Sequence, residues 1–135
     1  MPELGGIHHV KIPVTDVARS LAWYQKAFGL KTTMDFSEEG VLKGVVGEIP
    51  GLTNTFVALR ENIETAKALS GFDPIAFGVL ERSDVEAWEA HMDEVGIAHL
   101  PVVAAAMGWI LRLQDPDGLE VHIYSWAKPE PESVS

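Results

Sequence analysis

The sequence predicts an α+β fold built from two copies of one unit, in which a strand is followed by a helix and three further strands (βαβββ). Residues 7–30 contain an alternating strand, a capped amphipathic helix and a closing glycine, and residues 75–97 repeat these features in the same order. Such a repeat is typical of a duplicated supersecondary unit. A chain of 135 residues with 47% hydrophobic content is also apolar enough to form a globular core.

The first unit opens with a strand over residues 7–14, in which Val10, Ile12 and Val14 share one face. Thr15 or Asp16 is expected to cap the helix that follows. Gly29 is expected to end it. The apolar stripe of this helix consists of Val17, Leu21, Tyr24 and Phe28. Three strands are then expected near residues 30–36, 41–47 and 55–60, with turns at 37–40 and 50–51.

The second unit opens with a strand over residues 75–80. Ser83-Asp84-Val85-Glu86 has the pattern of a capping box, which predicts the start of a helix. The apolar stripe of that helix consists of Val85, Trp88, Met92 and Val95. Strands near residues 99–103, 109–114 and 119–125 complete the unit.

These elements divide the chain into four parts. Residues 1–60 form the first unit, 61–73 a polar connector, 74–126 the second unit, and 127–135 a tail rich in proline and glutamate that is expected to be disordered. Each unit would bury its helix on one face of a curved mixed sheet. Pairing the two uncovered faces would enclose a central trough.

Side chains opposite the helix-packing face are expected to line this trough. Arg112 would favour an anionic or carbonyl-bearing ligand there. Trp109, which opens its strand, is expected to line the trough as well. The complete set expected to bind a ligand or to act in catalysis is His9, Lys11, Phe56, Ala76, Trp109, Arg112, His122 and Tyr124.

Four sequence motifs resemble the vicinal oxygen chelate superfamily, also called the glyoxalase/bleomycin resistance protein/dioxygenase family. They are Ile7-His8-His9-Val10, Val14-Thr15-Asp16, Trp23-Tyr24 with Phe28-Gly29-Leu30, and the run from Asp115-Pro116-Asp117-Gly118 to His122. The resemblance covers both repeats. It implies a fold of two βαβββ units around a trough.

The resemblance also implies a divalent metal held by up to four trough residues, which fall on His9, Ala58, Pro74 and His122 in this sequence. Alanine and proline side chains offer no ligand atom, whereas a catalytic site usually has about three protein ligands. Glu120 is a third ligand only if its strand bends, because it lies two residues from His122. We therefore expect that no cofactor is required, and that any divalent metal is bound weakly by His9 and His122.

Three functions remain open. One is a protein that binds a small organic molecule in the trough without a complete metal site. The second is a metal-independent enzyme in which His9 or His122 is the general acid or base. The third is a metal-dependent lyase, isomerase or dioxygenase that uses these two histidines as ligands.

Composition limits the partners. A formal charge of −10 argues against binding to nucleic acid or to anionic membrane surfaces. The chain has no cysteine, so thiolate chemistry and disulfides are absent. No secretion signal or membrane span is expected, which favours a cytoplasmic protein. A homodimer is expected, because an unpaired curved sheet would expose much apolar area.

Overall fold

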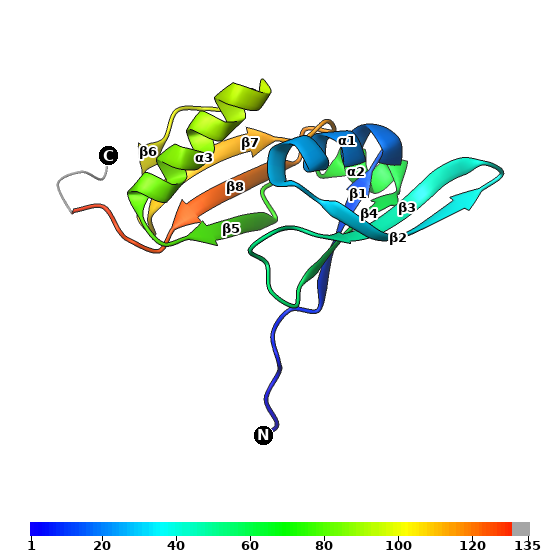
Figure 1. Cartoon of the computed structure of the whole chain (residues 1–135), viewed down its shortest axis with the longest axis horizontal. Helices are drawn as coiled ribbons and strands as arrows, with labels where there is room; N and C mark the ends of the chain where they lie inside the picture. The colour runs from blue at the N-terminus through cyan, green and yellow to red at the C-terminus, as the bar shows by residue number, and fades with distance from the viewer. Residues whose placement is uncertain (131–135) are drawn as a thin grey trace. The chain divides into compact units, whose positions relative to one another are not determined.

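A computed structural model describes residues 1–130 of the chain (Figure 1). The chain forms two compact units, residues 1–69 and the part from Ser70 onward. The first unit contains β1 (His9–Val14), α1 (Val17–Phe28), β2 (Lys31–Glu38), β3 (Val41–Glu48), β4 (Phe56–Glu61) and α2 (Ile63–Ala68). The second unit contains β5 (Ile75–Val79), α3 (Arg82–Val95), β6 (Val103–Ala104), β7 (Trp109–Gln114) and β8 (Glu120–Ser125). The predicted pair of βαβββ repeats is confirmed.

Each unit has one four-stranded mixed sheet. The first sheet has the order β1-β4-β3-β2 and the second has the equivalent order β5-β8-β7-β6. In both, the first and last strands of the unit pair in parallel and the remaining pairs are antiparallel. The two sheets therefore repeat one topology, as the internal sequence repeat predicts.

The helix of the first unit forms where the sequence places it. The Asp16 side chain accepts a hydrogen bond from the Arg19 backbone N–H at 3.1 Å, so Asp16, rather than Thr15, is the N-cap. Gly29 ends α1 in the left-handed conformation with φ 71°. The helix packs on β3 and β4 through buried Val17, Tyr24 and Phe28.

The second helix begins earlier than the predicted capping box. The Asp84 carboxylate accepts a hydrogen bond from the Glu81 backbone N–H at 2.9 Å, so the N-cap is Glu81 and not Ser83. The prediction failed because Asp84 at the third helical position performs the role assigned to Glu86. Val85 and Met92 are fully buried and anchor α3 on β7 and β8, which it covers in Figure 1.

Two further segments differ from the sequence prediction. The strand expected over residues 99–103 is reduced to β6 and a single bridge between His99 and Leu113. Pro101 interrupts the pairing because it has no N–H to donate. The segment 61–73 contains α2, which Asn62 caps by accepting from the Thr65 N–H at 3.1 Å.

The tail can be compared only in part. Residues 127–130 lie in no helix or strand, and 131–135 are outside the described residues. Within residues 1–130, no helix combines the length and apolar character needed to cross a bilayer.

Burial alternates along the strands and identifies the two faces of each sheet. Ile12 and Val14 of β1 are buried on the face that packs against the helix, while His9 and Lys11 are exposed on the other face. In β5, Ala76 and Gly78 are exposed and alternate with half-buried neighbours. We call the face opposite the helix-packing side the open face of each sheet.

Candidate ligand-binding faces

Four of the expected site residues share the open face of the second sheet. Ala76, His122 and Arg112 lie directly opposite one another on β5, β8 and β7 and form one row across the sheet. Tyr124 lies two residues along β8 in the next row, beside Gly78. Strand alternation predicted this grouping, because a period of two keeps these side chains on one face.

His122 is held by carboxylates. It is 7% exposed, its Nε2 lies 3.1 Å from Oε1 of Glu120, and its Nδ1 lies 3.6 Å from Oδ2 of Asp73. Glu120 also accepts a hydrogen bond from Gln114 Nε2 at 2.8 Å. These contacts fix the orientation of the imidazole ring, which is required of a general acid, a general base or a specific hydrogen-bond donor.

The Glu120 carboxyl stays ionised over a wider pH range than an ordinary glutamate. Desolvation by burial acts to raise its pKa, but the hydrogen bonds from His122 and Gln114 and the charges of His122 and Arg112 together lower the pKa below its ordinary value. Glu120 is therefore an acceptor that orients His122.

Arg112 carries an unused hydrogen-bond donor. Its Nε is buried and has no hydrogen-bond partner among the described residues. A buried donor without an acceptor costs about 1–3 kcal/mol. An oxygen of a ligand that reached this N–H after a small rotation of the guanidinium would recover that free energy.

Trp126 lies on the same open face and was missed in the sequence analysis. A Cβ atom on Gly78 would overlap the Trp126 ring, so the indole lies directly over the glycine. Trp126 itself is 69% exposed. The Trp126 backbone N–H donates to the Val79 carbonyl at 2.8 Å, which continues the pairing past the end of β8. Extending the alternation of His122 and Tyr124 by one step would have identified this tryptophan.

Trp109 is on the opposite side of the second sheet from Arg112, which corrects the sequence expectation. It has the parity of buried Leu111 and Leu113, and the Arg82 guanidinium at the start of α3 lies 3.8 Å from its ring centroid. The expectation considered only which strand carried Trp109 and not its parity, and a shift of one residue moves a side chain to the other face.

The open face of the first sheet carries His9, Lys11 and Phe56. His9 pairs directly with Phe56, and Lys11 pairs with Ala58. The Nδ1 atoms of His9 and its neighbour His8 are 3.0 Å apart, and the His8 ring lies 5.5 Å from the Phe56 ring. Beside Lys11 the face contains a hollow of about 140 Å³.

The donor set does not fit the four-ligand metal centre that the sequence resemblance implies. Ala58 is 5% exposed and places a methyl group where a ligand atom is expected, and Pro74 offers none. Both Glu120 oxygens accept hydrogen bonds, from His122 and from Gln114. In the part of the chain that the structure describes, no three His, Cys, Asp or Glu side chains converge as metal ligands.

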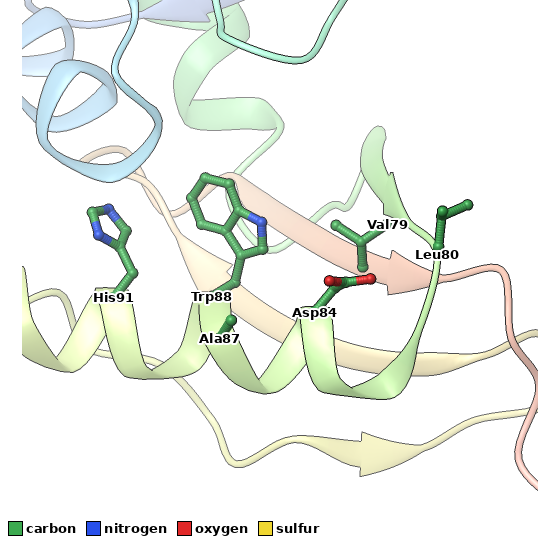
Figure 2. A pocket seen from close by; sticks show the side chains of 6 residues that line it. All are labelled: Val79, Leu80, Asp84, Ala87, Trp88 and His91. Atoms are coloured by element: carbon green, nitrogen blue, oxygen red, sulfur yellow. The ribbon is translucent and has the colours of Figure 1, made fainter.

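A larger hollow of about 470 Å³ lies on the helix side of the second unit (Figure 2). It is lined by Val79, Leu80, Asp84, Ala87, Trp88 and His91. Figure 2 shows Trp88 and His91 projecting from the same side of α3, and their rings meet edge to face with centroids 5.4 Å apart. None of the site residues expected from the sequence lines it.

Residues 6–123 match the Glyoxalase/Bleomycin resistance protein/Dioxygenase superfamily. A comparison with curated proteins gave no match.

Solved structures share the fold at low sequence identity. A glyoxylase/bleomycin resistance protein/dioxygenase domain from Frankia sp. EAN1pec is 21% identical with a TM-score of 0.70, over 91% of this chain and 98% of that one. An antibiotic binding protein from Streptomyces sp. CB03234 is 18% identical with a TM-score of 0.73, over 93% and 98%. Lactoylglutathione lyase from Agrobacterium tumefaciens is 15% identical with a TM-score of 0.71, over 92% and 96%.

Proposed function

Since the chain belongs to the Glyoxalase/Bleomycin resistance protein/Dioxygenase superfamily, we propose that it binds a small organic molecule against the open face of its second sheet. This face is one wall of the trough expected from the sequence. The observation that carries the proposal is the buried Arg112 Nε without a partner, in the same row as the oriented His122. A small molecule with a suitably placed oxygen satisfies that donor.

The other side chains on this face favour a flat, partly polar ligand. Trp126 is exposed and Tyr124 is half-buried, so both can offer ring surface for stacking. Arg112 and His122 offer polar groups in the row beside them. An aromatic compound carrying a carbonyl or carboxylate group combines these two requirements.

Binding does not depend on a complete metal centre in this proposal. An antibiotic binding protein and a lyase both have this architecture, so the fold alone does not choose between binding and catalysis. The choice of binding follows from Ala58 and Pro74, which remove two expected ligand positions.

Catalysis by His122 is the second candidate function. The observation that favours it is the contact between His122 and Glu120, whose lowered pKa keeps an ionised carboxylate on the imidazole. His122 would then act as general acid or base, with His9 assigned the same role or that of a weak metal ligand. A rate that falls at least about a hundredfold in His122→Gln, with ligand affinity retained, would establish this candidate.

A second copy of this chain is the proposed protein partner. Apolar side chains that remain exposed, such as Met34, Phe72 and Leu80, support association because burying them on a partner releases water. Sedimentation equilibrium at micromolar concentration tests the proposal. A dimer mass is expected, and a strictly monomeric mass contradicts it.

Ligand-observed NMR with 4-hydroxyacetophenone, a flat ring that carries a carbonyl group, tests the binding proposal. Saturation transfer to this probe is expected with the unmodified chain and should weaken about fivefold or more in Arg112→Gln and in Trp126→Ala. Glu94→Gln is the control, because Glu94 is an exposed residue of α3, which covers the other side of the second sheet. Absence of transfer, or equal transfer in all variants, contradicts the proposal.

A further inference from the structure

The hollow on the open face of the first sheet combines positive charge with an apolar floor. It measures about 140 Å³ and is lined by side chains from all four strands: Lys11, Met34, Phe36, Val46, Ala58 and Arg60. Strand register explains the grouping, since Met34, Val46, Ala58 and Lys11 form one row and Phe36, Gly44 and Arg60 form the next.

The two cations of this hollow have no carboxylate partner. Lys11 and Arg60 are both exposed, and neither forms an ion pair with any residue from 1 to 130. The Arg60 guanidinium lies over the Phe36 ring at 4.2 Å from its centroid, which leaves its N–H edge free to bind oxygen atoms. Unpaired cations are notable here, because the chain carries twenty acidic residues and only ten Lys and Arg.

Nearby acidic residues do not cancel this charge. Asp35 also borders the hollow, but it pairs with Val45 and has the parity of the helix-packing face. Glu48 has the parity of the open face, but it pairs with Phe56 one row beyond Ala58 and does not line the hollow. The side chains that project into the hollow therefore carry two positive charges.

The floor and one wall are apolar. Ala58 is 5% exposed, while Met34 and Phe36 are 65% and 40% exposed on the edge strand β2. Gly44 lets the Phe36 ring lie close to the sheet, because a Cβ on this residue would be 2.7 Å from the ring. A ligand that rests on this floor removes apolar surface from water, and it weakens the solvent screening of the two cations.

We propose that this hollow binds a small organic anion. The carboxylate, sulfonate or phosphate group lies between Lys11 and Arg60, and the apolar part of the molecule rests on Ala58, Val46 and Phe36. Ala58 stands where the family resemblance implies a metal ligand, and the two flanking side chains supply positive charge in that region. All residues that carry this inference belong to the first unit, so it does not depend on the contacts proposed on the second sheet.

Two fluorescent probes with the same ring skeleton test the inference. 1-Anilinonaphthalene-8-sulfonate carries a sulfonate, and N-phenyl-1-naphthylamine lacks it. The sulfonate probe is expected to lose about fivefold in affinity in Lys11→Gln and in Arg60→Gln, and more than about tenfold in the double variant. The neutral probe should change less than about twofold. Raising the salt from about 50 to about 500 mM should weaken only the sulfonate probe.

Control variants separate the site from general charge and from misfolding. Lys26→Gln removes the same charge from the exposed side of α1 and should leave both probes unaffected. Arg60→Lys keeps the charge and should retain most of the affinity for the sulfonate probe, which a fold defect would not allow. Equal affinity of the two probes, or an equal loss of sulfonate binding in Lys26→Gln, overturns the inference.

Discussion

Gly78 has a role that only the position of a distant side chain explains. Its φ is not in the left-handed region, so no backbone conformation requires a glycine there. The requirement is steric, because the Trp126 ring occupies the space of its missing side chain. A glycine in a strand interior usually marks such a close approach.

We predict that Gly78→Ala displaces Trp126 and weakens binding of a flat ligand on the second sheet. The tip of an exposed side chain can move aside, so the unfolding free energy should change by less than about 1 kcal/mol. The measurements are tryptophan fluorescence, chemical denaturation and saturation transfer to 4-hydroxyacetophenone. Gly5→Ala is the matched control, because a Cβ there meets no atom within 4 Å. Unchanged fluorescence and binding would disprove the assigned role of Gly78.

Strand alternation predicted the faces of Arg112, His122 and Tyr124, though not that of Trp109, and it did not predict their neighbours. A period of two placed Arg112, His122 and Tyr124 together, and the register confirms that grouping. It did not reveal that Gly78 lies under Trp126, because strand pairing joins residues that are far apart in the chain. The local sequence pattern does not specify which residues of two paired strands lie opposite each other.

His99 links the C-terminal end of α3 to the segment that follows the helix. Its Nε2 lies 2.6 Å from Oδ1 of Asp93 on the helix, and its Nδ1 lies 2.8 Å from the Leu100 carbonyl oxygen. Both partners only accept hydrogen bonds, so both ring nitrogens must donate and the bonded ring is the charged imidazolium. The positive charge also interacts favourably with the negative end of the α3 helix dipole, where the last turn has no basic residue.

We predict that His99 makes stability depend on pH near neutrality. The backbone hydrogen bond to Leu100 is the largest cause of its raised pKa, followed by the hydrogen bond to Asp93 and the charges of Asp93 and Glu89, against opposing desolvation. Because its pKa is raised in the folded state, protonated His99 stabilises the fold, and this stabilisation is complete below the ordinary pKa of 6.5. It is lost as pH rises through the folded-state pKa.

His99→Gln should therefore be less stable than the unmodified chain by about 1 kcal/mol in acid, with a smaller difference in alkali. Urea unfolding at about pH 5.5 and about pH 9 measures this difference. Asp93→Asn should produce part of the same loss, and the double variant should lose less than the sum of the two. Additive effects that are independent of pH would refute the assignment.

Elements with strong local signals were predicted well, and those decided by distant contacts were not. Asp16 and Gly29 mark the two ends of α1 as predicted, because a capping residue acts within one turn of the helix. The strand expected over residues 99–103 is reduced to β6 and one bridge at His99, because Pro101 has no N–H to donate to the sheet.

At the scale of the whole molecule, duplication fixes the fold while divergence between the copies determines the chemistry. Both sheets have the same strand order, yet their open faces differ. The first has Lys11 and Arg60 around an apolar floor, and the second has Arg112 and His122 beside Trp126. The family match extends over residues 6–123 and covers both copies, so membership of the family cannot by itself distinguish these two faces.

The last prediction is that this chain does not retain a stoichiometric divalent metal. Of the four positions implied by the family resemblance, only His9 and His122 offer ligand atoms, and the Glu120 carboxylate is already engaged by His122 and Gln114. An ion bound by two neutral imidazoles keeps most of its water and exchanges readily, whereas a carboxylate ligand would also balance its charge.

Dialysis without chelator, followed by metal analysis, tests this prediction. Occupancy well below one zinc or nickel ion per chain is expected, and 4-hydroxyacetophenone should bind equally with and without added chelator. If about one metal per chain survives dialysis, and is lost together with activity in both His9→Ala and His122→Ala, the metal-dependent enzyme replaces the binding protein. A carboxylate from outside this set must then approach the histidines, because Ala58 and Pro74 cannot supply one.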